Sequence, residues 1–420
     1  MKFLHAADIH LDSPLRGLER YDGAPVDELR GATRLAFENL IELAIQEEVS
    51  FVLLVGDLYN GDWKDYNTGL FFVHHISRLR EAGIPAYIVA GNHDAASQIT
   101  KTLKPPDNTH IFSTSTPESL VREEIGIAIH GQGFATRAVT EDLTAAYPNA
   151  KSGLLNIGLL HTSLDGRPGH APYAPCSIDG LKSKGYDYWA LGHVHKREIV
   201  SEIPWIVFPG NIQGRHVRES GVKGCTLVSV ENEEIASVEH HALDVVRWES
   251  LIVDTSNLPS VEEILEKGRV EIERATDAAD GRLVAARITL LGQCTEHRKL
   301  RASHEQVTAD FRALANDYGQ GRFWVEKVRI DTQPVQELKD AMERDDALGG
   351  LLREIHDLEV DPDQLLALSE EVASLRNKLP AELLTGEDGF DPTDDATLRA
   401  LLPDIKEILI NELLRTGDTE

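Results

Sequence analysis

The sequence predicts an α/β protein, in which a two-sheet sandwich flanked by helices is followed by a small α/β domain and a helical C-terminal region. Three observations predict this fold. Short apolar runs of strand type alternate with helical patterns over roughly the first 200 residues. Residues 198–240 then hold several short strand patterns in succession, and a β-α-β-α-β pattern follows residue 248. Strands that alternate with helices and then gather into a strand-rich run favour sheets covered by helical layers.

The expected elements of the first domain follow from hydrophobic spacing. Strands are predicted at residues 2–7, 51–55, 86–90, 157–160 and 187–191, and then at 198–201, 205–208, 224–230 and 235–239. A helix is expected over residues 26–47, where apolar residues recur at helical spacing, and another over 65–81. Gly83 and Pro85 end the second helix. We place the end of this domain at residue 247.

The pattern restarts at residue 248. Strands at 251–253, 283–291 and 323–330 alternate with helices at 260–273 and 296–315, and Pro334 ends a compact domain at residues 248–334. Residues 335–420 are helix-patterned, with apolar stripes around residues 348–355, 365–375 and 398–414. These stripes predict either a helical appendage packed on its own domain or a helix that docks in a partner's groove.

Composition bounds the setting of the protein. No apolar run approaches the ~20 residues of a membrane span, so no membrane partner is expected. The chain opens directly into a strand without a signal-peptide pattern, and its three cysteines are scattered, which favours a reducing, cytoplasmic location. The formal net charge is −28. Residues 335–420 hold 23 acidic and 8 basic residues, so more than half of the excess lies in the tail.

Five short polar blocks each follow one of the predicted strands. In an open α/β sheet such loops gather at the carboxyl ends of the strands, so the five blocks are expected to converge. Together they offer carboxylate, amide and imidazole ligands suited to two divalent ions, an arrangement that suits phosphoester cleavage. A lone histidine is more often structural, but five blocks in this setting predict a binuclear site. The blocks are Asp8-Ile9-His10, Gly56-Asp57, Gly91-Asn92-His93-Asp94, His161-Thr162 and Gly192-His193-Val194-His195.

In this order the blocks resemble the calcineurin-like metallophosphoesterases. Residues 1–12, MKFLHAADIHLD, are similar to the start of the SbcD-type DNA-repair nucleases. Residues 188–197, YWALGHVHKR, followed by FPGN at 208–211, resemble the YhaO branch of that family. The motif match covers roughly residues 1–245, and beyond it the likeness is one of layout. The resemblance implies a four-layer αββα sandwich, followed by the small cap domain of these nucleases.

The resemblance also implies a role for each residue of the site. Asp8, His10 and His195 would hold the first metal, Asp57 would bridge both metals, and Asn92, His161 and His193 would complete the second. The expected ions are Mn²⁺, with Fe²⁺, Zn²⁺ or Mg²⁺ as alternatives. His93 is expected beside the scissile phosphate without binding metal, where an imidazole can protonate the leaving oxygen. Asp94 is expected to hold the His93 tautomer or to start the following turn.

A glycine-rich loop follows the last motif. In residues 210–218, GNIQGRHVR, the residues Asn211, Arg215 and Arg218 are candidates for contact with DNA phosphates, because backbone amides and guanidinium groups suit phosphate oxygens. The alternative is an ordinary basic loop that pairs with acidic neighbours.

The donor set predicts a metal-dependent hydrolase, and the resemblance implies a DNA exonuclease or endonuclease that acts in repair through water activated between two metals. It also implies DNA and an SMC-like coiled-coil ATPase subunit as partners, and a homodimer. A small-molecule or cyclic-nucleotide phosphodiesterase is one alternative. A DNA-tethering subunit of an ATPase complex with weak hydrolysis is another.

Overall fold

The computed structural model describes residues 1–13, 23–60, 66–96, 105–166, 173–334 and 342–358, with scattered positions between 393 and 413. It forms two compact units. The first comprises Met1–Val253, Leu265–Thr289 and Gln306–Arg329, and the second comprises Asp254–Ile264, Leu290–Glu305 and Ile330–Glu420.

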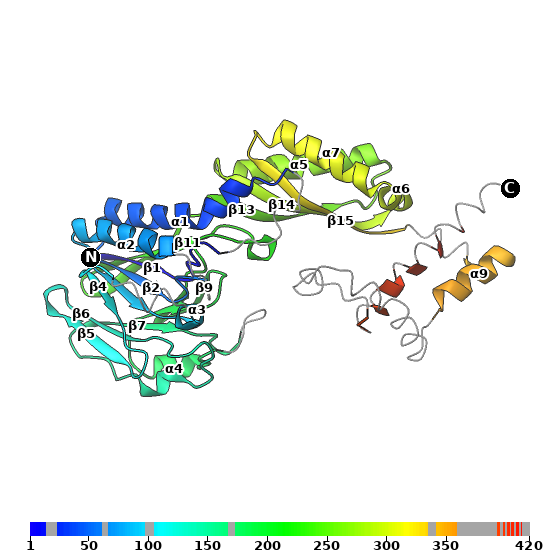
Figure 1. Cartoon of the computed structure of the whole chain (residues 1–420). Coiled ribbons are helices and arrows are strands. Elements are labelled where there is room, and N and C mark those ends of the chain that lie inside the picture. The colour runs from blue at the N-terminus through cyan, green and yellow to red at the C-terminus, as the bar shows by residue number, and fades with distance from the viewer. Residues whose placement is uncertain are drawn as a thin grey trace. The chain divides into compact units, whose positions relative to one another are not determined.

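The body of the first unit is the predicted two-sheet sandwich, and each of its sheets has six strands (Figure 1). The first sheet has the order β12-β11-β1-β2-β3-β4. In it β1 to β4 are parallel to one another, and β11 is antiparallel to both of its neighbours, β1 and β12. The second has the order β5-β6-β7-β8-β10-β9, with β6, β7, β8 and β10 parallel. The strands of the first sheet are β1 (Lys2–Ala6), β2 (Phe51–Val55), β3 (Ala86–Val89), β4 (Thr109–Ile111), β11 (Gly224–Glu231) and β12 (Glu234–Ala242). Those of the second are β5 (Glu118–Arg122), β6 (Ile127–Gln132), β7 (Leu155–His161), β8 (Tyr188–Gly192), β9 (Glu198–Glu202) and β10 (Trp205–Phe208).

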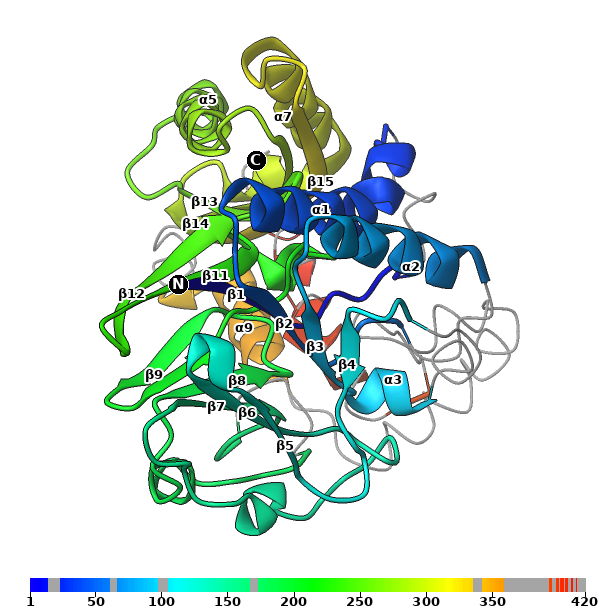
Figure 2. The same ribbon diagram turned by 90° about the vertical axis from the view of Figure 1, so that its left-hand side faces the viewer.

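Three apolar clusters hold these layers together. One lies between the first sheet and the helices α1 (Val26–Gln46) and α2 (Tyr66–Glu81), which run side by side over that sheet (Figure 2). A second cluster fills the space between the sheets, where Phe3, Phe51 and Tyr188 meet. The third packs the outer face of the second sheet around Trp189 against α4 (Ile178–Lys182) and the 3₁₀ turn η3 (Leu143–Ala146). This helix–sheet–sheet–helix stacking is the predicted four-layer αββα sandwich.

The expected β-α-β-α-β order also follows the sandwich. A three-stranded sheet of β13 (Val246–Asp254), β14 (Leu283–Cys294) and β15 (Phe323–Pro334) accompanies α5 (Val261–Ala278), α6 (His297–Ala302) and α7 (His304–Tyr318). The single helix expected over 296–315 is in fact two, because the chain leaves helical geometry at Ser303, where φ is −116°. Within the first unit, Trp248 of β13 packs edge to face on Trp324 of β15 at 6.1 Å.

Three strands were not predicted from the sequence. These are β4, β5 and β6, of which β6 lies inside the second sheet. Its sequence, Ile-Ala-Ile-His-Gly-Gln, breaks the apolar pattern after three residues. His130 is nevertheless buried, where it bonds to Asn156, and a side chain at Gly131 would lie 2.8 Å from the ring of Phe112. Tertiary contacts therefore override a weak local pattern here.

Little of the predicted C-terminal region lies within the described residues. Helix α9 (Ala347–His356) coincides with the first expected stripe, and its Leu352 packs with Ile410. The second stripe, at 365–375, lies outside the described residues, and the third is described only in part. Across the part of the chain that the structure describes, no helix combines the length and the apolar character that a bilayer span requires.

Candidate metal centre

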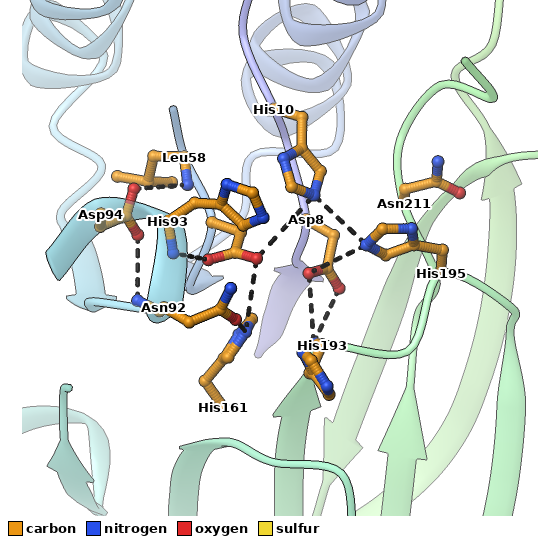
Figure 3. A network of polar contacts seen from close by, with 12 residues as sticks. Asp8, His10, Leu58, Asn92, His93, Asp94, His161, His193, His195 and Asn211 are labelled. Atoms are coloured by element: carbon orange, nitrogen blue, oxygen red, sulfur yellow. Dashed lines mark hydrogen bonds and ion pairs between the residues drawn. The ribbon is translucent and has the colours of Figure 1, made fainter. Parts of the chain in front are cut away.

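The five polar blocks converge at one edge of the sandwich (Figure 3). They leave the carboxyl ends of β1, β2 and β3, which are parallel to one another in the first sheet, and of β7 and β8, which are parallel in the second. Three groups of side chains lie with one potential ligand atom each within 4.8 Å of one another. They are Asp8, His10 and His195; His10, Asp57 and His93; and Asp57, His161 and His193.

The first group surrounds the Nε2 atom of His195. This atom lies 3.2 Å from His10 Nε2 and 3.7 Å from Asp8 Oδ1. Asp8 is held in place because both of its carboxylate oxygens accept from the backbone N–H of His193, at 3.2 and 2.9 Å. Asp8 and His10 are each 1% exposed, whereas the side chain of His195 is 18% exposed. Asp8 and His10 are therefore the buried members of the group, and His195 is the member nearest the solvent.

Asp57 links this group to the second one. Its Oδ2 atom lies 3.9 Å from His10 Nε2 and 3.5 Å from His161 Nε2, so one oxygen faces both groups. Its other oxygen, Oδ1, accepts from the backbone N–H of His93 at 2.9 Å. Of the two oxygens, Oδ2 is therefore the better placed to be shared between two ions.

The second group is organised around His161. Its Nδ1 lies 3.1 Å from the carbonyl oxygen of Val55, which can only accept, so Nδ1 carries the proton of the neutral ring. The lone pair of Nε2 then faces Asn92 Oδ1 at 3.0 Å and Asp57 Oδ2 at 3.5 Å. Three electron-rich atoms thus point at one another, an arrangement that a cation stabilises. The same attraction for positive charge is visible in the metal-free protein, where burial acts to lower the pKa of His161 but Asp57 raises it to about 9, so that Nε2 takes up a proton when no cation is bound.

The glycines of the motifs allow these loops to approach closely. A side chain at Gly91 would lie 2.3 Å from Asp57 Oδ1, and one at Gly192 would lie 2.0 Å from the carbonyl oxygen of Val55. Backbone strain gathers at the same place: Asp8, Asp57 and His193 have φ values of 52°, 51° and 98°. Non-glycine residues seldom adopt such values, which cluster at ligand-binding sites.

The donor set fits two divalent ions. It supplies two carboxylates, one amide oxygen and four imidazoles, apart from His93, which is the mixture that Mn²⁺, Fe²⁺ and Zn²⁺ accept. His10 is fully buried and its Nε2 points into the cluster, 3.2 Å from His195 Nε2 and 3.9 Å from Asp57 Oδ2. Every residue that the sequence singled out for the metals lies in this one place.

His93 and Asp94 lie on the short helix α3 (Asn92–Ala96) beside the cluster. The ring of His93 contacts that of His10 edge to face at 5.1 Å and is partly exposed. Asp94 is buried, and its carboxylate accepts from the backbone N–H groups of Leu58, Tyr59 and Gly91, so it ties two ligand-bearing loops together. Burial, followed by the charge of Asp57, raises the pKa of Asp94 to about 7. The expected hold of Asp94 on the His93 tautomer stays a prediction.

The glycine-rich loop differs from its expected role at two of three positions. Asn211 is fully buried, and its amide donates to Gln213 O and to Glu219 Oε2, so it is not offered to a DNA phosphate. Arg215 donates to both carboxylate oxygens of Glu219, which fits the alternative of a basic loop paired with an acidic neighbour. Arg218 is exposed, and its contact with DNA stays a prediction.

Glu219 is the residue of the site that the sequence analysis missed. It lies one position beyond the loop considered there, is 6% exposed, and its Oε1 lies 2.7 Å from His195 Nδ1. Burial acts to raise the pKa of Glu219, but hydrogen bonds from His195 and Arg215 outweigh it and hold this pKa well below its usual range. The available signal was a single acidic residue in an otherwise basic segment.

Comparisons with known proteins agree with this geometry. A family model described as calcineurin-like phosphoesterase matches residues 1–197, and one described as the middle domain of metallophosphoesterase YhaO matches residues 248–333. The uncharacterized metallophosphoesterase YhaO of Bacillus subtilis is 34% identical over 359 residues, which cover 84% of this chain and 87% of that protein.

More distant relatives are DNA double-strand break repair proteins named Mre11. The protein from Sulfurisphaera tokodaii is 27% identical over 273 residues, covering 61% of this chain and 66% of its own length. The protein from Aeropyrum pernix is 28% identical over 249 residues, covering 54% and 57% respectively. The chain thus spans roughly half to two thirds of these relatives. On the site geometry and the match to YhaO over most of both chains, this protein belongs to the calcineurin-like metallophosphoesterases of the YhaO type and is a metal-dependent phosphoesterase.

Proposed function

We propose that this phosphoesterase is a nuclease that hydrolyses phosphodiester bonds of DNA during repair. The observation that carries the proposal is the pairing of a complete two-ion donor set with relatives named as double-strand break repair proteins. The αββα fold alone does not select DNA, because many phosphoesterases share it.

In this function Asp8, His10 and His195 would hold one ion, Asn92, His161 and His193 would hold the other, and Asp57 would serve both. When bound, a pair of Mn²⁺ ions supplies an acidified water and a positive field for the charge that develops on the phosphate. The identity of the metal as Mn²⁺ is part of the proposal.

The protein's own contribution to the reaction centres on His93. Its ring lies at the partly exposed side of the cluster, and its backbone N–H is anchored to Asp57 Oδ1. From there it donates a proton to the leaving oxygen of the cleaved strand, as a general acid. The neighbouring Asp94 keeps the α3 loop against the Asp57 loop, so that His93 stays in register with the ligands.

DNA must approach a chain of net charge −28. We therefore propose that affinity depends on the bound ions and on few basic side chains, with exposed Arg218 among them. In chelator, DNA binding is expected to be weak, and with Mn²⁺ its salt dependence is expected to be shallow.

Cleavage of linear DNA, measured beside hydrolysis of cyclic nucleotides and bis(p-nitrophenyl) phosphate in Mn²⁺, tests the substrate class. Turnover of DNA that exceeds that of the small diesters is expected. Turnover confined to small diesters would assign the site to a small-molecule phosphodiesterase. Tight DNA binding with negligible cleavage of any diester would indicate a tethering subunit.

We further propose the three-part organisation of residues 1–247, 248–334 and 335–420, with the last part docking an SMC-like coiled-coil ATPase in the cytoplasm. The amphipathic helix α9 supports the docking of a partner. The three buried free cysteines support the cytoplasmic location. A chain that ends at Pro334 should keep metal binding and small-diester hydrolysis while it loses the ATPase in a pull-down. Undiminished co-purification would place the contact elsewhere in the chain.

A further inference from the structure

Charged groups surround the Nδ1 side of the His195 ring, which is the side opposite Asp8 and His10. His195 Nδ1 lies 2.7 Å from Glu219 Oε1, and Arg215 donates to both oxygens of Glu219, at 3.2 and 2.7 Å. The backbone N–H of Arg215 and the amide of Asn211 also donate to Glu219 Oε2, at 2.8 and 2.9 Å. Both oxygens of the Glu219 carboxylate are thus hydrogen-bonded, and the residue is only 6% exposed.

This network determines which nitrogen of His195 carries the proton. Glu219 is an acceptor, because both of its carboxylate oxygens already receive N–H groups of Arg215 and Asn211, so a contact of 2.7 Å with His195 requires an N–H on Nδ1. Arg215 Nη2 also lies 3.1 Å from the same nitrogen, but two donors meet there once Nδ1 carries its proton, and Nη2 donates instead to Glu219 Oε1 at 2.7 Å. With the proton on Nδ1, the lone pair of Nε2 points at Asp8 and His10.

We propose that Glu219 is a positioning residue, which fixes the ring and the tautomer of His195 so that Nε2 is presented to the first metal. This inference rests on the proposed metal site. A carboxylate behind a ligating histidine raises its basicity and restricts its rotation, and loss of such a partner typically lowers metal affinity by about 10–100-fold.

A further contact shows that the position of His195 is constrained. Lys223, which is 6% exposed, donates from Nζ to the backbone carbonyl of His195 at 2.8 Å. Glu219 therefore acts on the ring while Lys223 acts on the backbone. His195 needs both, because it is the most exposed member of its group and lies on a loop after β8.

The variant Glu219→Gln tests the proposal, since it keeps the shape of the side chain and removes the charge. The chain offers a matched control in Glu326, which is also 6% exposed and is also paired with the fork of one arginine, Arg287, but lies on β15. Glu326→Gln should lose a comparable ion pair without an effect on the metals. Glu219→Asp, which keeps the charge but shortens the side chain, is the second variant if Glu219→Gln does not fold.

Calorimetric titration with Mn²⁺ is the first readout. Wild type and Glu326→Gln should bind two ions equally well, and Glu219→Gln should weaken one of the two sites about 10–100-fold. Equal Mn²⁺ affinity in Glu219→Gln and wild type would overturn the proposal.

The ¹⁵N shifts of the His195 ring in metal-free protein are the second readout, and they do not depend on catalysis. Wild type should show a protonated Nδ1, and Glu219→Gln or Glu219→Asp should show a mixture of tautomers. A ring that keeps a single Nδ1–H tautomer in the variant contradicts the role of Glu219. Wild-type protein that binds two Mn²⁺ but cleaves no DNA would instead refute the nuclease function and leave this inference intact.

Discussion

Substitution of Gly192 by alanine should damage the metal centre through sterics alone. The added Cβ would lie 2.0 Å from the carbonyl oxygen of Val55 and 2.9 Å from His161 Nδ1. Ordinary contact begins near 3.4 Å, so the groups must separate by about 1.4 Å. Val55 and His161 are both fully buried within close-packed layers that cannot yield by that amount without cost.

Two magnitudes follow from this clash. Overpacking of this kind typically costs about 1–3 kcal/mol of folding stability. The methyl group also presses on the contact between His161 Nδ1 and Val55 O, which sets the direction of Nε2 toward the second ion. A misplacement of about 1 Å in such a group can lower the rate by about 10²-fold.

Urea unfolding, Mn²⁺ titration and hydrolysis of bis(p-nitrophenyl) phosphate measure these effects on one preparation. The matched control is Gly31→Ala in the interior of α1, where no atom lies within 4 Å of the new methyl group. That variant should be stabilised by roughly 0.5–1 kcal/mol with unchanged activity. Wild-type stability, metal content and turnover in Gly192→Ala would refute the reasoning, because the loops would then have room that the structure does not show.

Two other variants probe the site, and a third probes a buried histidine of the sandwich. Asp57→Asn removes the negative charge from the side chain that faces both groups. The variant protein should stay folded but lose one of two Mn²⁺ ions and its activity. Metal analysis that finds two ions, together with normal turnover, would contradict the bridging role. His93→Gln should keep both ions and lose about 10²–10⁴-fold in rate, and a loss of metal would instead make His93 a ligand, in keeping with its place beside His10 and Asp57. The third variant concerns pH. Burial lowers the pKa of His5 from 6.5 to about 3, and the hydrogen bond to Leu191 O, which acts to raise this pKa, does not offset the burial. The unfolded chain then binds the proton more readily, so stability is complete above pH 6.5 and falls as pH drops toward 3. Between pH 7 and about pH 4.5, the free energy of unfolding should fall by about 2.5 kcal/mol less in His5→Gln than in wild type, and equal slopes in urea melts would show that His5 does not titrate in this way.

The sequence by itself determined the framework of the fold and the chemistry of the site. Strand runs such as Phe51–Val55 are continuous apolar segments, and a polar block follows each of them directly, so both signals are local. Parallel strands of one sheet end at a common edge, and this rule brings Asp57 beside Asn92. His161 belongs to the second sheet, and the stacking of β7 on β2 brings it to Asp57. The glycines before Asp57, Asn92 and His193 were visible in the sequence as parts of motifs. Only the structure explains them, because it shows that a side chain at these positions would clash with its neighbours.

Tertiary structure alone decided how the loop side chains are used. Glu219 reaches His195 across 24 residues, and Asn211 turns inward to the same carboxylate, because packing from distant segments sets the rotamers of loop residues. Strand β6 is recognisable only once its neighbours β5 and β7 bury His130 and Gln132. Local sequence specifies which groups are present and roughly where the chain turns. Glu219 and Asn211 turn inward because distant segments bury them, and the sequence of their own loop does not identify those segments.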